Sequence, residues 1–391
     1  MIDNKLYEYM HSQTQAAPMR FVRYAAGRID WNARLIGILG PRGVGKSTLI
    51  LQRINALSLP SQLYVSADHL YFVEHPLHEL VDNFVKEGGT HLYIDEVHKY
   101  KGWSRVLKQA YDVYPKLHIV FTGSSVLDLR QGEADLSRRA LMYHLQGLSF
   151  REYLELFHRI PAIPYSLADI LNHQVQLPAQ MEHPLPLFRD YLQRGYYPFA
   201  LEDHFEIRLQ QVVQHTIEVD IPQYADMKAS TARKLKHLLI IIAQNAPYKP
   251  VTEHLAKLIA VSKNNIPDYL NILHRAGMIG LLRDDTAGMH NLAKIEKVYI
   301  DNPTLQNVLA DGAPDIGNLR ETFFYNQLRL NHPLYASRKA DFYLPPYTFE
   351  VGGRKKKQQQ IEGMPDAFVV KDDIEYGHGN VIPLWHFGMN Y

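Results

Sequence analysis

The sequence predicts an α/β protein whose core is a parallel sheet, followed by a helical region and a smaller C-terminal α/β part. The main observation is that apolar runs of strand length recur at 34–39, 62–66, 91–95 and 117–121, each followed by a helix-like segment. Repeats of strand, loop and helix build parallel sheets. In addition, glycine, carboxylate or hydroxyl residues end three of these runs. Finally, a chain of 391 residues is long for one domain, so further parts are expected.

The first run ends in a glycine-rich loop that matches the phosphate-binding pattern G-x-x-x-x-G-K-[ST]. A strand before the loop and an apolar helix after it are the context that this motif requires. Glycines let backbone N–H groups close around a polyphosphate, and the positive end of the following helix points to the same phosphates. The sequence therefore predicts ATP binding by a P-loop made of Gly40, Pro41, Arg42, Gly43, Val44, Gly45, Lys46, Ser47 and Thr48.

Four residues are expected to carry the chemistry of ATP hydrolysis. Lys46 should reach the β- and γ-phosphates, and Ser47 should offer its hydroxyl to Mg²⁺. The third run ends in Asp95 and Glu96, which is the Walker B pattern. In P-loop ATPases the aspartate steadies the Mg²⁺ shell, and an adjacent glutamate polarises the attacking water. The pair belongs at the carboxyl end of its strand, because that edge of a parallel sheet faces the phosphates.

Two further groups near this core leave alternatives open. At the end of the fourth run, a hydroxyl residue, Ser124, could sense the γ-phosphate and hold the lytic water. The alternative is that Ser124 or Ser125 is a helix N-cap, and one residue could fill both roles. Arginines 20, 23 and 28 recur at loosely helical spacing before the first run. They are expected on a solvated face, and contact with the nucleotide edge or a partner is the alternative.

Composition excludes several classes of protein. The net charge of +1 gives no global attraction to nucleic acid or membrane, and the absence of cysteine excludes disulfides, thiolate metal sites and cysteine nucleophiles. No apolar run approaches 18 residues, and the start lacks the pattern of a signal peptide. A cytoplasmic protein without membrane contact is expected.

The second half of the chain contains two further patterns. Helical segments at 252–262 and 263–277 resemble a winged helix-turn-helix, whose second helix could enter a major groove. Its polar face carries few basic residues, so packing or regulation is favoured over DNA contact. The last hundred residues predict another α/β stretch, with a hairpin at 340–344 and 347–351.

With these motifs, the chain resembles the prokaryotic AAA-type ATPases that carry a DUF4143 domain after the ATPase core. The resemblance rests on Gly40–Thr48, Ile94–Glu96, Thr122–Ser125 and Leu148–Leu154. It implies a phosphate-sensing arginine before the last of these motifs. Counting back from Leu148 places it on Arg139, and Arg138 replaces a family glycine, so the choice between the two arginines stays open.

The resemblance also implies a restriction-endonuclease-like fold at the C-terminus, whose active members carry D…[DE]-x-K. Asp341 and Glu350 occupy the carboxylate positions, and Glu321 is a third candidate. The lysine position holds Gly352, and the first lysine after it is Lys355, so we expect a fold retained without nuclease chemistry. The nearby lysines are expected to form a solvated basic loop.

The expected domains are an ATPase domain at 1–157, a helical linker or lid at 158–226, a winged-helix-like domain at 227–290 and an inactive endonuclease-like domain at 291–391. The expected function is Mg²⁺-dependent ATP hydrolysis that moves the C-terminal domains. The alternative is an ATP-gated module that binds DNA or a protein, and an ATP-driven nuclease is less favoured. The partner protein and assembly into a homo-oligomer stay open.

Overall fold

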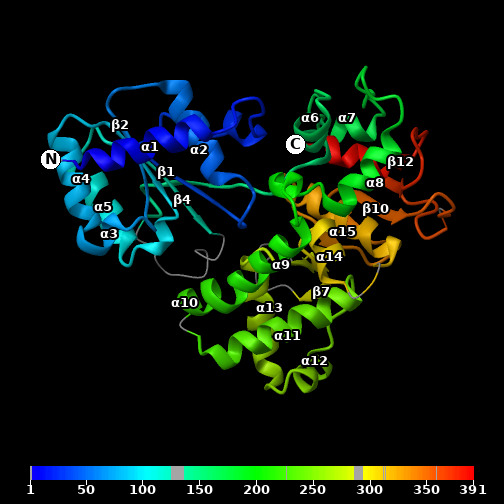
Figure 1. The fold of residues 1–391 in the computed structure, drawn as a ribbon. Helices are drawn as coiled ribbons and strands as arrows, with labels where there is room; N and C mark the ends of the chain where they lie inside the picture. The colour runs from blue at the N-terminus through cyan, green and yellow to red at the C-terminus, as the bar shows by residue number, and fades with distance from the viewer. Residues whose placement is uncertain are drawn as a thin grey trace. The chain divides into compact units, whose positions relative to one another are not determined.

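The computed structural model describes residues 2–124, 136–225, 227–285, 294–310, 312, 314–357 and 359–391. The chain divides into two compact units, Met1–Gln146 and Gly147–Tyr391. Each unit has its own sheet and is treated by itself (Figure 1).

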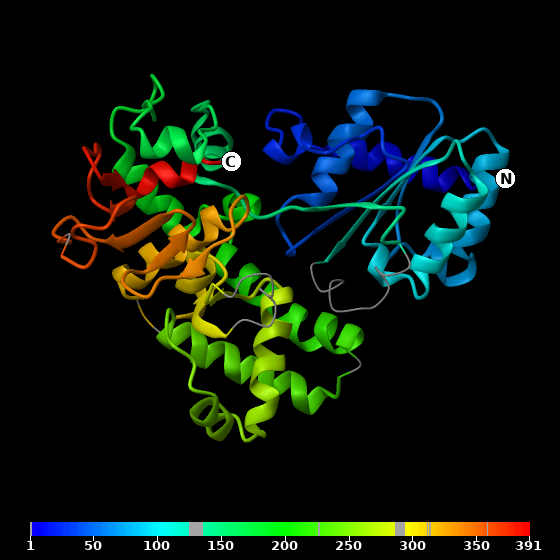
Figure 2. The same ribbon diagram turned by 180° about the vertical axis from the view of Figure 1, so that it is seen from behind.

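The first unit contains a five-stranded parallel sheet in the order β2-β3-β4-β1-β5. Figures 1 and 2 show α1 and α2 on one face of this sheet, and α4 and α5 on the other. Its elements are α1 (Asn4–Ala16), the 3₁₀ turn η1 (Tyr24–Gly27), β1 (Leu35–Gly40), α2 (Lys46–Leu57), β2 (Gln62–Ser66), α3 (Tyr71–Glu74), α4 (Leu77–Lys86), β3 (His91–Asp95), η2 (Val97–Lys99), α5 (Trp103–Val113), β4 (His118–Ser124) and β5 (Leu141–His144).

Burial on both faces explains the composition of these strands. All six residues of β1 are buried, and it lies between β4 and β5. A strand covered on both sides needs a continuous apolar run rather than an alternating one. The register pairs Gly40 with Ser124, and Ser66 with Asp95, so the carboxyl ends of these strands lie at one edge. The predicted parallel sheet is confirmed.

The second unit contains a mixed seven-stranded sheet in the order β12-β11-β10-β9-β8-β6-β7. Its helical elements are α6 (Phe150–His158), α7 (Leu167–Leu171), α8 (Pro184–Arg194), η5 (Pro198–Leu201), α9 (Phe205–His215), the π-turn η6 (Thr216–Asp220), α10 (Ile221–Ala225), α11 (Ala229–Asn245), α12 (Thr252–Leu258), η7 (Lys263–Asn265), α13 (Ile266–Arg275), α14 (Pro303–Leu309), α15 (Ile316–Leu328) and η9 (Leu384–Met389). Its strands are β6 (Ile279–Arg283), β7 (Ile295–Ile300), β8 (Tyr335–Ala336), β9 (Phe342–Leu344), β10 (Tyr347–Gly352), β11 (Ala367–Lys371) and β12 (Val381–Pro383).

One apolar core joins distant segments of the second unit. Phe150, Phe188, Phe323 and Trp385 come from α6, α8, α15 and η9, and all belong to one buried cluster. The last segment, red in Figure 1, lies among α6, α7 and α8. The 158–226 stretch, expected as a linker or lid, therefore contributes side chains to this core.

The expected hairpin is confirmed as the antiparallel pair β9–β10. The strand β6, which follows the winged-helix-like helices, lies between β8 and β7 in the same sheet. The winged-helix assignment and the four domain boundaries stay predictions.

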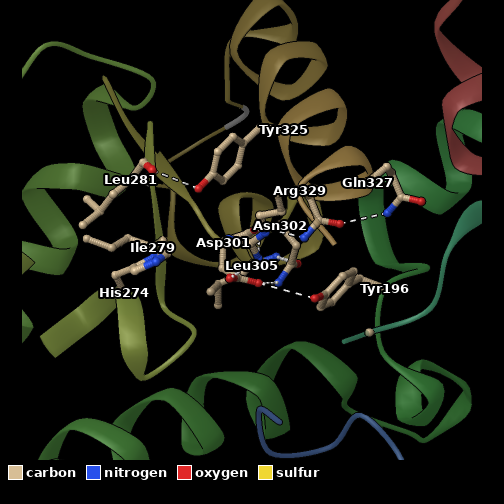
Figure 3. Close-up of polar contacts among 12 residues, drawn as sticks. Tyr196, His274, Ile279, Leu281, Asp301, Asn302, Leu305, Tyr325, Gln327 and Arg329 are labelled. Atoms are coloured by element: carbon tan, nitrogen blue, oxygen red, sulfur yellow. Dashed lines mark hydrogen bonds and ion pairs between the residues drawn. The ribbon is translucent and has the colours of Figure 1, made fainter. Parts of the chain in front are cut away.

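A buried polar cluster lies where β7 ends against α15 (Figure 3). Nη2 of Arg329 lies 2.5 Å from Oδ1 of Asp301, and both side chains are largely buried. The hydroxyl of Tyr325 donates to the carbonyl oxygen of Leu281 over 3.2 Å. Nδ1 of His274 lies 3.0 Å from the carbonyl oxygen of Ile279. Buried charges are tolerated when paired in this way, so the cluster ties α13, β6 and α15 together.

Candidate functional site

The glycine-rich loop has the backbone conformation that a phosphate-binding loop requires. Gly43 and Gly45 adopt φ angles of 82° and 93°, which side chains rarely tolerate. A Cβ on Gly40 would lie 2.2 Å from the carbonyl oxygen of Leu145, so only glycine fits where β1 ends. The helix α2 begins at Lys46, directly after the loop, and its N-terminus faces the loop.

Lys46 and Ser47 lie in the first turn of α2. Nζ of Lys46 donates to the carbonyl oxygens of Gly40 and Pro41, at 2.8 and 2.9 Å. The ammonium group is therefore held at the loop, close to where the chain turns. Ser47 is half-buried beside it. These placements suit the predicted contacts with phosphate and Mg²⁺.

Arg23 supports the loop from outside the motif. Its guanidinium donates to the carbonyl oxygens of Val44 and Gln146, and its side chain is only 5% exposed. The expectation of a solvated face is wrong for this residue, because it is buried against the loop. No local pattern in the sequence identifies its partners, which are 21 and 123 residues away.

The carboxyl end of β3 is held by a network of hydrogen bonds. Asp95 accepts from the hydroxyl of Tyr64 over 2.8 Å at Oδ2, and from the hydroxyl of Thr122 at Oδ1. The backbone N–H of Glu96 donates to Oδ1 of Asp95 and to Oγ1 of Thr122, at 3.1 and 2.9 Å. Both oxygens of the Asp95 carboxylate therefore have fixed donors, and its orientation is set before any ligand binds.

Glu96 has an unusual backbone and a charged partner. Its φ angle is 48°, in the left-handed region, which costs free energy for a residue with a side chain. Its Oε1 lies 3.9 Å from Nη1 of Arg42 in the loop. Burial raises the pKa of Glu96, and Arg42 opposes that effect. A raised pKa brings a carboxylate closer to the value that a general base needs near neutral pH.

The sheet brings the expected hydroxyl residue to the loop as well. Ser124 ends β4 and pairs in register with Gly40, so it lies directly beside the loop. Thr122, two residues earlier, is the hydroxyl that contacts Asp95 and Glu96. Ser125, the other expected N-cap, lies outside the described residues, so the choice between sensor and cap stays a prediction. Thr122 and Tyr64 were not among the expected site residues.

Arg139 lies elsewhere in the described part of this unit. It precedes β5, whose first paired residue, Leu141, aligns with Ile36 near the start of β1. This is the edge of the sheet opposite to the loop. Its Nε and Nη2 donate to the two oxygens of Asp112, at 2.8 and 3.0 Å. The structure does not bring Arg139 to the P-loop of its own chain.

A second group of charged residues lies on the sheet of the other unit. Nζ of Lys297 on β7 lies 3.0 Å from Oε2 of Glu321 and 3.2 Å from Oδ1 of Asp341. Burial alone would lower the pKa of Lys297, but the two carboxylates outweigh it and the net direction is upward. Burial and Asp341 raise the pKa of Glu321.

Lys356 forms an ion pair with Glu350, which is buried. Gly352 makes room for it, because a Cβ there would lie 2.7 Å from the Lys356 side chain. The expectation that this lysine belongs to a solvated loop is wrong, since it folds back onto β10.

Lys297 was missed, although a lysine inside an apolar strand is a signal that could have identified it. Among the described residues, no three His, Asp or Glu side chains could hold a metal ion together.

Family comparison agrees with the first unit. Residues 32–154 match the family model described as an AAA domain. With the parallel sheet and the loop described above, this match supports a P-loop domain of AAA type. Residues 185–315 match a domain of unknown function, DUF8612. This match does not support the expected DUF4143 domain, which stays a prediction.

Three solved structures illustrate the fold comparison. An ORC1 protein from Aeropyrum pernix in complex with DNA has a TM-score of 0.32 and 12% identity, covering 78% of this chain and 91% of that chain. AMPPCP-bound DnaA from Aquifex aeolicus has a TM-score of 0.26 and 13% identity, covering 70% and 89%. C. elegans PCH-2 has a TM-score of 0.27 and 15% identity, covering 69% and 70%.

No curated protein sequence matches the chain. Within the residues that the structure describes, no helix has both the length and the apolar character needed to cross a membrane.

Proposed function

We propose that the protein is a Mg²⁺-dependent ATPase. The observation that carries the proposal is the placement of two motifs at one edge of the sheet. Gly40 of the loop aligns with the end of β4, and Asp95 and Glu96 are hydrogen-bonded to Thr122 on the same strand. The ion pair between Arg42 and Glu96 directly links the two motifs.

The chemistry of these side chains fits a nucleotide with its magnesium ion. A hydroxyl and a carboxylate are the oxygen ligands that Mg²⁺ prefers, and Ser47 and Asp95 would hold it. The bound ion would neutralise charge on the phosphates. Backbone N–H groups of the loop and Lys46 would bind the phosphate oxygens.

In the proposed reaction Glu96 orients a water molecule toward the γ-phosphorus and takes up its proton. The water oxygen forms a bond to phosphorus, and the bond from phosphorus to the β,γ-bridging oxygen breaks. The products are ADP and inorganic phosphate, and the proton on Glu96 leaves to solvent. Change in nucleotide state would then move the second unit.

Two variants test the proposal. Lys46→Ala should weaken ATP binding at least a hundredfold, because a charge-assisted contact to the phosphates is lost. Glu96→Gln should bind ATP normally and hydrolyse it at least a hundredfold more slowly. Lys116→Ala and Glu79→Gln are matched controls, since both residues are exposed and neither belongs to either motif. Wild-type hydrolysis by Glu96→Gln would exclude the role given to this carboxylate.

The second candidate is an ATP-gated module that binds DNA. It rests on four exposed residues just before α13, the helix that would enter the major groove. These residues are Ser262, Lys263, Asn264 and Asn265. Lys263 is paired with Glu253 over 3.4 Å, which weakens this candidate. A fluorescence titration with duplex DNA, with and without ATP, separates the two functions. Binding that falls steeply with salt would mark phosphate contacts.

A further inference from the structure

Arg42 is the third residue of the loop, and its guanidinium lies on the Glu96 side of the loop. The distance of 3.9 Å between Nη1 and Oε1 is long for an ion pair, and the side chains are 22% and 33% exposed. A long, partly exposed pair of this kind contributes little to stability. Arginine binds phosphate oxygens through two parallel hydrogen bonds, which is a stronger arrangement.

The surroundings of Glu96 restrict which cation can act on it. Its backbone N–H is held by Asp95 and Thr122, so its position is set by the end of β3. Nη1 of Arg42 lies 3.9 Å from its Oε1. Lys46 is turned to the carbonyl oxygens of the loop instead. Arg42 is thus the loop residue whose cation is paired with this carboxylate.

We propose that Arg42 is a catalytic arginine that the phosphate-binding loop supplies to its own nucleotide. This inference rests on the proposed ATPase function. Arg42 pairs with Glu96 as the structure shows, and when ATP binds, its guanidinium moves to the oxygens of the γ-phosphoryl group. There it stabilises the negative charge of the transition state while water attacks and ADP leaves. Glu96, released from the pair, is then free to accept the proton of the water.

The placement of Arg139 suggests that the positive charge needed at the γ-phosphate comes from another residue. Arg139 lies at the opposite edge of the sheet and is bonded to both oxygens of Asp112. From this edge Arg139 would reach a γ-phosphate by approaching the nucleotide of another copy of the chain. Arg42 needs no such neighbour, because it belongs to the loop itself. The proposal therefore predicts hydrolysis that depends on Arg42 within a single chain.

The test compares Arg42→Ala and Arg42→Lys with the wild type in nucleotide binding and turnover. Arg42→Ala should bind ADP within twofold of the wild type, bind a non-hydrolysable ATP analogue about tenfold more weakly, and lose at least a hundredfold in kcat. Arg42→Lys should retain part of the activity, since it keeps the charge but not the paired hydrogen bonds. Guanidinium ion at millimolar concentration should partly restore turnover to Arg42→Ala. Arg105→Ala, an exposed arginine of α5, is the matched control and should behave as the wild type.

Three outcomes would overturn the proposal. Unchanged or increased kcat in Arg42→Ala would mean that the arginine only restrains Glu96. Equal losses of ADP and ATP-analogue affinity would place it away from the γ-phosphate. Failure of guanidinium to restore turnover, with circular dichroism unchanged, would mean that the lost activity does not come from the guanidinium group acting on the nucleotide. Lys46→Ala keeps the two proposals apart: if it leaves ATP binding intact, the ATPase proposal fails, whereas a normal Arg42→Ala beside a defective Lys46→Ala rejects only the role of Arg42.

Discussion

Tyr64 on β2 donates its hydroxyl hydrogen to Oδ2 of Asp95, the last residue of the neighbouring strand, over 2.8 Å. The ring of Tyr64 is itself stacked on that of Tyr9 in α1, with 6.0 Å between the ring centres. Burial and Asp95 raise the pKa of Tyr64, so the hydroxyl stays protonated and serves as a donor. The N-terminal helix therefore supports the carboxylate proposed to bind the magnesium shell.

Replacing Tyr64 by Phe should impair hydrolysis without removing the loop. One oxygen of Asp95 would lose its donor, and hydrogen bonds to charged groups contribute about 1.5–3 kcal/mol. We expect the free energy of unfolding to fall by about 2 kcal/mol and kcat to fall about tenfold, with a higher Mg²⁺ concentration at half-maximal rate. Steady-state ATPase assays across a Mg²⁺ series measure this.

Tyr143→Phe is the control for this variant. Its hydroxyl accepts from the backbone N–H of Asp30 over 3.0 Å, on β5 rather than beside Asp95. It should leave kcat and the Mg²⁺ dependence unchanged. If Tyr64→Phe shows the same behaviour as Tyr143→Phe, the carboxylate does not depend on its tyrosine.

Arg329→Met should strongly destabilise the second unit. It leaves the carboxylate of Asp301, only 2% exposed, without its cation, and such a change costs about 3–5 kcal/mol. Arg208→Met is the matched control, because Arg208 pairs with Glu202 at the surface, where both side chains are 53% exposed. That loss should stay below about 1 kcal/mol. Urea unfolding of both variants provides the comparison, and equal effects would mean that the buried pair is not special.

The second unit should lose stability in mild acid. Burial and Arg329 lower the pKa of His274 to about 4, while Asp301 acts against them and Arg283 with them. The unfolded chain, with an ordinary histidine, therefore binds more protons than the folded chain between about pH 6.5 and 4. Stability should fall across that window as pH decreases, by about 3 kcal/mol for this residue. Burial lowers the pKa of His386 to about 3, which adds to the slope.

Hydrogen exchange of peptides from residues 147–391, measured at several pH values, follows this effect. His274→Gln should reduce the slope and leave the part that comes from His386. His237→Gln, an exposed position on α11, should keep the full slope. Stability that is constant from pH 7 to 4.5 in the wild type would contradict the prediction.

The C-terminal sheet should not cleave DNA. Gly352 occupies the lysine position of the expected motif, but Lys297 and Lys356 supply the positive charge beside the carboxylates instead. The prediction now rests on the ion pairs, in which Lys297 holds Glu321 and Asp341, and Lys356 holds Glu350. Incubation with plasmid and single-stranded DNA in Mg²⁺ or Mn²⁺ should leave both intact. Cleavage that disappears in Asp341→Ala would make the protein a nuclease.

Local patterns were enough to predict the first sheet and its loop. The loop and the carboxylates at the end of β3 could be predicted because each is recognised from its neighbours in the sequence, above all from the strand before it. Tyr64 and Arg23 could not, because their roles depend on which strands become neighbours and which carbonyl groups they meet. The lysine beside Asp341 was sought two positions after Glu350, whereas the fold supplies it from β7, 44 residues before Asp341.

The position of β6 between β8 and β7 limits how the chain can be divided. A fragment ending after β6 would keep the helices α11 to α13 but lose both strands that pair with it. The backbone N–H and C=O groups of β6 would then be left open on two sides, and unpaired strands of this kind recruit other chains. Such a fragment should aggregate instead of behaving as a portable DNA-binding module. Any exchange of this region between related proteins would have to include β7 and β8 together with β6.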